Sequence, residues 1–244
     1  MSKQENETIR LNKYLAMCGV CSRREADRMI DEGKVSINGK TARMGQVVCE
    51  TDVVCVDGKR VTGQEKKVVL AYYKPIGVTC SEKDEHAEKL VKDMIDYPIR
   101  VTYAGRLDRD SEGLLLLSND GDLIQAMMKG SNNHEKEYVV SVYEKLTDEF
   151  LQKMRDGVFL EELNVTTKPC KVEQMGERKF RIILTQGFNR QIRRMCRAFD
   201  YHVRALKRVR VMSVTLAGLR QGEYRELNQK EMDKLYQACG IRRG

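Results

Sequence analysis

The sequence predicts an α+β protein in two unequal parts: a small N-terminal domain, and a larger domain built on a mixed, mainly antiparallel β-sheet with flanking helices. The chain has 244 residues, which suits one large domain or two unequal ones. Apolar residues make up 41% of the chain, enough to bury a core. Strand-like segments are numerous and do not alternate strictly with helical ones, which argues against a doubly wound parallel sheet.

The small domain is expected over residues 8–61 and begins with two helices. Apolar residues at helical spacing mark the first helix: Leu11, Leu15 and Cys18. Ser22 begins the second helix through a capping box with Glu25, and Gly33 ends it.

Short strand-like runs complete the small domain. Tight turns are expected at the Asn-Gly pair 38–39 and the Asp-Gly pair 57–58, because these dipeptides favour hairpins. The polar, apolar-poor segment 62–67 is interpreted as a linker.

The larger domain is expected over residues 68–244. Its strand-like segments are VVLAYYK, VTYAG, GLLLLS, EYVVSVY, KFRIILTQ and VRVMSVTL. The segments DLIQAMMKG and TDEFLQKMRDG have helical character and lie between some of these strands. Asn228 is expected to cap a last helix that Gly240 closes.

Composition narrows the function classes. The net charge is +8, which favours an anionic partner such as nucleic acid. No signal peptide or membrane span is recognisable, so a cytoplasmic protein with reduced cysteines and no membrane partner is expected. Gly-rich phosphate loops are absent, which counts against nucleotide cofactors, and the single CxxC pair is a weak metal signal. We expect no cofactor and no metal, and by default a monomer.

Positive charge is concentrated in residues 186–212, where eight basic residues face one acid. The segment RQIRRMCRAF predicts a helix whose apolar face is formed by Ile192, Met195, Cys196 and Phe199. Its opposite face carries four arginines: Arg190, Arg193, Arg194 and Arg197. A solvated basic face is one interpretation. Anion binding is favoured, because solvated faces usually mix signs and the N-terminal domain is also basic.

Asp108 is the candidate reactive group. It lies between Arg106 and Arg109, just before a strand of buried character. A carboxylate beside guanidinium groups stays charged and can serve as a nucleophile or base without a metal. A surface turn with chance ion pairs is the alternative. The nearby acids Asp110, Glu112, Asp120 and Asp122 are interpreted as turn and cap residues.

These segments together resemble the RNA pseudouridine synthases, in the branch typified by the small-subunit rRNA enzyme RsuA. Residues 9–56 are similar to the RNA-binding module named after ribosomal protein S-four. YYKPIGVTCS, GRLDRDSEGLLLLSNDGDL, HEKEYVVSV and GFNRQIRRMCRAFDYHVRALKRVRV match the catalytic motifs in order. Within the branch, the similarity is greatest to the enzyme that modifies uridine 2604 of the large-subunit 23S rRNA.

The resemblance implies the reaction and its central residues. Uridine is flipped out of the stack and isomerised to pseudouridine in ribosomal RNA, with 23S favoured over 16S rRNA or tRNA. Asp108 attacks the sugar or takes its 2′ proton. Arg193 pairs with that carboxylate, and Tyr138 stacks on the uracil and helps to remove the C5 proton.

The resemblance also implies binding roles. Substrate contacts or support near the site are expected from Arg106, Ile192, Lys74, Asn189, Arg190 and Gln191. Contacts to the RNA backbone are expected from Arg194, Arg197, Arg204, Lys207, Arg208, Arg210, Arg10, Lys13, Arg23, Arg24 and Lys34.

Three other functions stay open on the sequence. A non-catalytic RNA-binding factor in ribosome assembly would need only the N-terminal module. A hydrolase that releases uracil would use Asp108 with water, and free uracil would reveal it. A DNA-binding protein that uses the first two helices would leave the larger domain unexplained.

Overall fold

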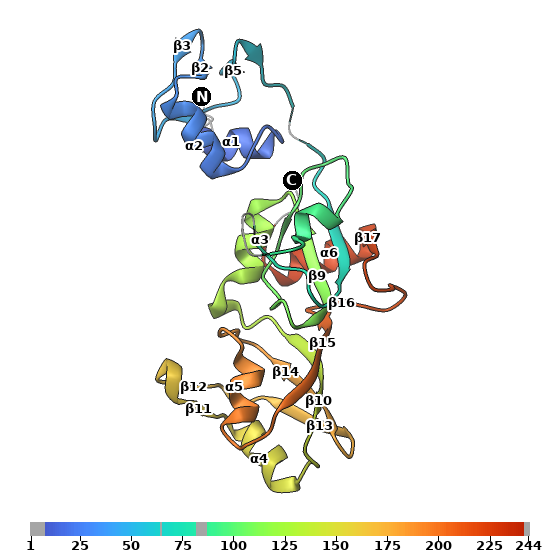
Figure 1. Ribbon diagram of the computed structural model, residues 1–244. Coiled ribbons are helices and arrows are strands. Elements are labelled where there is room, and N and C mark those ends of the chain that lie inside the picture. Colours follow the sequence, from blue (N-terminus) through green and yellow to red (C-terminus); the bar gives the residue numbers. More distant parts are fainter. Residues whose placement is uncertain (1–7, 64, 82–86, 242–244) are drawn as a thin grey trace, which may run out of the picture. The chain divides into compact units, whose positions relative to one another are not determined.

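The computed structural model describes residues 8–63, 65–81 and 87–241 in two compact units (Figure 1). The first unit ends at Lys67 and also includes Pro98–Arg100. The second unit comprises the rest of the described chain. Each unit has its own hydrophobic core.

The first unit contains two helices and short strands. Strand β1 (Ile9–Arg10) pairs with β4 (Val47–Val48), and helices α1 (Leu11–Met17) and α2 (Arg23–Asp31) follow β1. A four-stranded antiparallel sheet has the order β3-β2-β5-β6, with bounds Lys40–Thr41, Val35–Ile37, Val54–Val56 and Lys59–Arg60. The core is formed by apolar residues of both helices and the strands, among them Leu11, Leu15, Ala26, Ile30, Val35 and Val54.

Local signals account for much of this unit. The Ser22 side chain accepts a hydrogen bond from the Glu25 backbone N–H at 3.2 Å, as expected of a helix cap. The Glu25 carboxylate pairs with Arg28. Asn38 and Gly39 both have positive φ, at 50° and 78°, which is the conformation that a tight hairpin turn requires.

The second unit is built on a nine-stranded sheet. Its main path runs β13-β14-β10-β15-β9-β7-β17, with β16 on β15 and β8 on β9. Every described strand pair is antiparallel except β15 with β9, so the sheet is mixed and mainly antiparallel, as predicted. In chain order the bounds are Val69–Lys74 (β7), Thr102–Tyr103 (β8), Glu112–Ser118 (β9), Lys136–Val142 (β10), Lys171–Gly176 (β13), Lys179–Leu184 (β14), Val203–Val211 (β15), Val214–Thr215 (β16) and Tyr224–Glu226 (β17).

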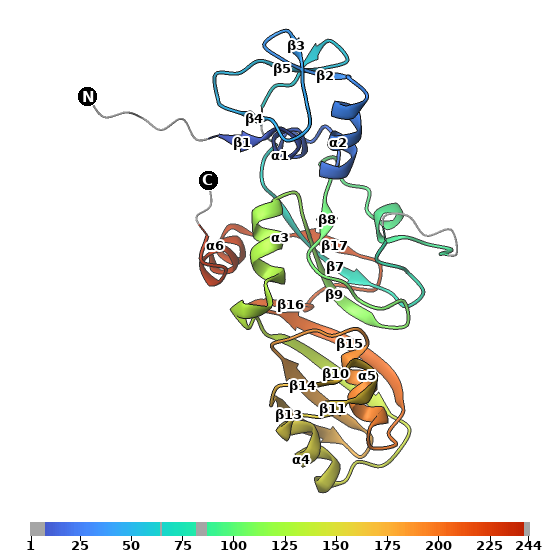
Figure 2. The same ribbon diagram turned by 90° about the vertical axis from the view of Figure 1, so that its left-hand side faces the viewer.

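Helices cover the two ends of this sheet on opposite faces. Figure 2 shows α3 (Gly121–Met128) and α6 (Gln229–Ala238) beside β7 and β17, and α4 (Asp148–Asp156) and α5 (Gln191–Arg197) beside β10 and β14. Leu114 and Leu116 of β9 share a core with α3 and α6, whereas the intervening Leu115 belongs to the core of the other face. The second face is therefore free of these two helices over β7 and β9, which β15 separates from β10.

Smaller elements complete the second unit. They are the 3-10 helices η1 (Val91–Met94), η2 (Gly130–Asn132) and η3 (Glu161–Leu163), and the hairpin strands β11 (Phe159–Leu160) and β12 (Val165–Thr166). Asn228 and Glu231 form the capping box that begins α6, and Gly240 follows the helix with a φ of 67°. Among the described residues, no helix is long and apolar enough to cross a membrane.

Candidate active site

Asp108 lies in the turn that leads into β9. The Ser111 N–H donates to the Asp108 carbonyl at 3.1 Å and closes the turn. Leu107 is buried and anchors its start, while Arg109 and Asp110 are exposed. The Asp108 carboxylate is half-buried and has no hydrogen bond from any residue that the structure describes. It is therefore available to a substrate.

Lys74, at the end of β7, supports this turn from inside. Its side chain is fully buried, and its Nζ donates to the carbonyls of Pro75 and Ser111 at 2.8 Å each. Burial lowers the pKa of Lys74 to about 8, although the negative charge of Asp108 acts in the opposite direction. Lys74 ties the turn after β7 to the turn of Asp108. It holds the site together and is too deeply buried to contact RNA directly.

Tyr138, on β10, connects the parts of the site. Its half-buried side chain packs against two clusters, one that contains Leu107 and one that contains Ile192 of α5. Its Cα partner across the sheet is Arg208 of β15. The structure thus gathers the Asp108 turn, Tyr138 and helix α5 on one face of the sheet.

Arg193 does not make the contact expected of it. Its Nε lies 3.3 Å from Oδ2 of Asp110, and its Nη2 donates to the Asp110 carbonyl at 2.9 Å. Its Nη1 donates to the Val203 carbonyl at 3.4 Å. The expected pair with Asp108 is therefore replaced by a pair with Asp110, because the turn presents the side chain and carbonyl of Asp110 to α5.

Asp110 is a site residue that the sequence did not reveal. It was interpreted as a turn residue, yet its carboxylate also accepts two bonds from Arg190, at 3.1 and 2.9 Å. Partial burial acts to raise the pKa of Asp110, but the bond from Arg190 and the charges of Arg193 and Arg190 outweigh it, so the pKa is lowered. The only feature of the sequence that could have indicated a role for Asp110 in the site was its position two residues after Asp108.

Helix α5 has the predicted apolar face, with Ile192, Met195 and Cys196 buried. Its arginine face is not free, however. In addition to the pairs with Asp110, Arg194 pairs with Glu162 of η3, and Nη1 of Arg197 lies 3.9 Å from the same carboxylate. Arg194 also donates to Asn189. Acids from two distant segments, Asp110 and Glu162, thus neutralise part of the arginine face that was expected to bind an anion.

Several predicted substrate contacts lie elsewhere than expected. Gln191 is only 4% exposed, and its Oε1 accepts from the Phe188 N–H, so it supports the start of α5 and does not face a substrate. Ile192 is also buried, within the core under α5. Arg106, Asn189 and Arg190 are exposed.

Two predicted backbone contacts are corrected by the structure. Arg208 is 3% exposed, and it donates to the carbonyls of Leu114 at 2.7 Å and Arg106 at 3.3 Å. Arg210 pairs with Glu135 and Glu137. The alternation of β15 and its pairing turn both arginines toward protein partners.

The remaining basic residues of β15 differ in their surroundings. Arg204 is exposed, and Nζ of Lys207 lies 4.6 Å from the centre of the Tyr73 ring. In the first unit, Lys13 is half-buried and the others predicted to contact RNA are exposed: Arg10, Arg23, Arg24 and Lys34. Nζ of Lys34 lies 2.7 Å from a Glu32 oxygen.

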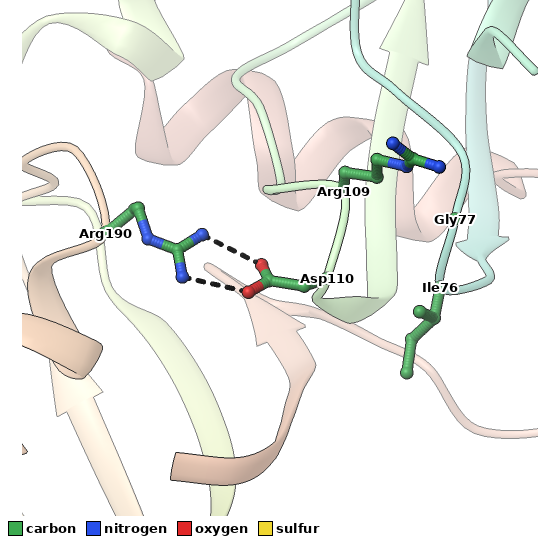
Figure 3. A pocket seen from close by; sticks show the side chains of 5 residues that line it. All are labelled: Ile76, Gly77, Arg109, Asp110 and Arg190. Carbon is green, nitrogen blue, oxygen red and sulfur yellow. Dashed lines mark hydrogen bonds and ion pairs between the residues drawn. The ribbon is translucent and has the colours of Figure 1, made fainter. Parts of the chain in front are cut away.

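A pocket opens beside the Asp108 turn (Figure 3). It is lined by Ile76, Gly77, Arg109, Asp110 and Arg190. The Gly77 N–H donates to the Arg109 carbonyl at 2.8 Å and joins the two turns that form it. All eight cysteines are free, and the described residues contain no group of three or more His, Cys, Asp or Glu placed to hold a metal ion.

Comparison with known proteins identifies the family of each unit. Residues 68–198 match the family model described as RNA pseudouridylate synthase, and residues 9–54 match the S4 domain model. The chain belongs to the RNA pseudouridylate synthase family. It is an isomerase whose partner is RNA, as the catalytic motifs implied.

Relatives extend over nearly the whole chain. The dual-specificity RNA pseudouridine synthase RluF of Escherichia coli is 44% identical over 95% of this chain and 79% of its own. The ribosomal large subunit pseudouridine synthase B of Bacillus subtilis is 37% identical over 93% of this chain and 95% of its own. A crystal structure of a pseudouridylate synthase superposes with a TM-score of 0.69 at 29% identity, over 93% of this chain and 99% of that one.

Proposed function

We propose that this pseudouridine synthase isomerises uridine in ribosomal RNA, at or near uridine 2604 of the 23S rRNA, with Asp108 as the reacting carboxylate. The observation that carries the proposal is the available Asp108 carboxylate beside Tyr138 and α5. The names of the relatives support the RNA class, since one is a dual-specificity RNA enzyme and another acts on the large ribosomal subunit.

The chemistry asks little beyond these groups. The Asp108 carboxylate either attacks C1′ as the bond between C1′ and N1 of uracil breaks, or removes the 2′ proton, so that uracil leaves and a glycal remains. The detached uracil turns, and C5 forms the new bond to C1′ as the ester bond between Asp108 and C1′ breaks or, in the glycal route, as Asp108 returns the proton to C2′. The C5 proton then leaves, and N1 gains one. No electrons are exchanged with another molecule. Tyr138 supplies a flat face for the base during its rotation.

Tritium release tests this proposal. The protein is incubated with unmodified 23S rRNA that carries tritium at uracil C5, beside the Asp108→Asn variant. The wild type should release one tritium per modified uridine, and the variant should be at least about 10³-fold slower. Mapping of the product on the rRNA then checks the position.

The other outcomes separate the alternatives. Release by the wild type from 16S rRNA or tRNA alone would contradict the 23S assignment. Free uracil as the product would indicate a hydrolase. Tight, salt-sensitive binding without release from any of the three RNAs would indicate a non-catalytic RNA-binding factor.

A further inference from the structure

The pocket beside the Asp108 turn is not used by the reaction as described. Its volume is about 440 Å³, within the range of small-ligand sites and large enough for one nucleotide. One of its lining residues is Arg109, which follows Asp108 directly in the chain. Arg109 and Asp110 belong to the turn that also carries Asp108, so a group held there would lie near a uridine that reacts at Asp108.

The lining combines an apolar surface with positive charge. Ile76 is 57% exposed, so its apolar side chain is accessible to a base, and three charged residues line the same pocket. In Figure 3 its side chain lies on the opposite side of the pocket from the Arg190–Asp110 pair. Together Arg109, Asp110 and Arg190 give the lining a net charge of about +1.

The two arginines are not equivalent. Both terminal nitrogens of Arg190 are bonded to Asp110, whereas the Arg109 guanidinium has no hydrogen-bond or ion-pair partner among the residues that the structure describes. Figure 3 shows the Arg109 side chain extending away from Asp110. Arg109 is therefore the group of this pocket that can take a phosphate without breaking a bond.

We propose that this pocket is a subsite for the nucleotide next to the target uridine in the RNA chain. The base of that nucleotide packs on Ile76, and its phosphate binds Arg109. This inference rests on the proposed function. A flipped-out uridine stays joined to both neighbours through its phosphates, and contacts to flanking nucleotides are a common source of sequence preference in enzymes that flip their target base.

Abasic substitution in the RNA tests the subsite. A short 23S-derived substrate, active in tritium release, is prepared with the base removed from the 5′ or the 3′ neighbour of the target. The proteins are the wild type, Ile76→Ala and Met175→Ala, a matched control with a 53% exposed apolar side chain on the edge strand β13.

The expected result is that Ile76→Ala and removal of the neighbouring base have non-additive effects on KM. Ile76→Ala should raise KM about five- to tenfold with kcat unchanged, at the lower end of base-contact effects. Removal of one of the two neighbouring bases should cost the wild type a similar factor and cost Ile76→Ala nothing more. Met175→Ala should behave as the wild type. Arg109→Ala should reduce the salt dependence of RNA binding by about one phosphate contact.

Failure of the subsite and failure of the proposed function give different results. Equal losses from the abasic substitutions in wild type and Ile76→Ala would overturn the subsite while tritium release still stands. A wild type that releases no tritium from any RNA would overturn the proposed function, and the subsite with it.

Discussion

The guanidinium of Arg193 lies against both the carboxylate and the backbone carbonyl of Asp110. The same carboxylate is bonded twice by Arg190, which immediately precedes α5. Asp110 thus joins the helix to the turn of Asp108. Arg193, which the sequence motif predicted to pair with Asp108, is instead held by the residue two positions further along the chain.

Asp110→Asn should therefore affect activity more than stability. The Arg190 and Asp110 side chains are 42% and 45% exposed, and exposed ion pairs contribute about 0–1 kcal/mol to the free energy of unfolding. Loss of the charge frees Arg193 and α5 to shift, and a shift of about 1 Å can cost roughly 10²-fold in rate. We expect kcat to fall at least about tenfold, measured by tritium release.

Glu162→Gln is the matched control, because Glu162 pairs with Arg194 and Arg197 on the same helix but lies on a different segment. It should leave kcat within about threefold of the wild type. Equal losses of kcat in the two variants would show that activity depends on neutralising the arginines of α5 by any acid, and not on the specific link between α5 and Asp110.

Arg204 and Arg208 should separate RNA binding from folding. Arg204→Ala removes an exposed charge, so RNA affinity should fall and the slope of log K against log salt should drop by about 1, with stability changed by less than about 0.5 kcal/mol. Arg208→Met removes the Arg208 donor from the buried carbonyl of Leu114, at about 1–3 kcal/mol, and from the part-buried carbonyl of Arg106. Its salt slope should match the wild type.

Urea denaturation and filter binding at several salt concentrations measure these effects. A reduced salt slope in Arg208→Met, without loss of stability, would contradict the structural role of this arginine.

Much of the fold follows from short-range signals. The Asn228–Glu231 box, the Asn38–Gly39 turn and the apolar face of α5 each depend on residues within one or two turns of chain. Such local patterns can be recognised without knowledge of what packs against them. Predicted elements with such signals agree with the structure. The segment VRVMSVTL does not form one strand, because Met212, with a φ of 52°, turns the chain between β15 and β16, and strand β13 was not predicted.

The site was less predictable because its contacts join distant segments. Arg190 and Asp110 are 80 residues apart, and no local pattern links them. The many basic residues of β15 also do not reveal in the sequence which arginines have side chains that are buried in the protein. Arg208 is buried because β15 pairs in parallel with β9, which places it opposite Gly113. That register is a property of the whole sheet.

Lys74 should make stability depend on pH. Its pKa is lowered to about 8 in the folded protein from 10.5, so between these values the unfolded chain binds more protons than the folded one. Stability should therefore rise with pH in that window. Lys74→Met removes the titration. The free energy of unfolding of the wild type minus that of the variant should increase from pH 8 to 10, by at most about 1.4 kcal/mol per pH unit.

The subtraction cancels groups that titrate alike in both proteins, such as Tyr72, whose pKa is raised by burial. Burial also raises the pKa of the Cys80 thiol, but the charge of Lys74 acts to lower it, so both proteins carry Cys80→Ala. Lys92→Met, at an exposed lysine, should give a flat difference. A flat difference for Lys74→Met as well would show that the buried ammonium keeps its ordinary affinity for the proton.

Gly113 lies where β9 and β15 approach each other most closely. It has a φ of 114°, and a Cβ added there would lie 2.2 Å from the Arg208 carbonyl oxygen. Gly113→Ala should thus lower the free energy of unfolding by about 3 kcal/mol or more, since it combines backbone strain with a clash against backbone that cannot move freely.

Gly121→Ala in α3 is the control, because its φ is ordinary and a Cβ there meets nothing within 4 Å. It should be neutral or up to about 1 kcal/mol more stable. If urea denaturation gave both variants the same stability, β9 and β15 could not pair as closely as described, and the buried bond from Arg208 to the Leu114 carbonyl of β9 would have to be abandoned with that pairing.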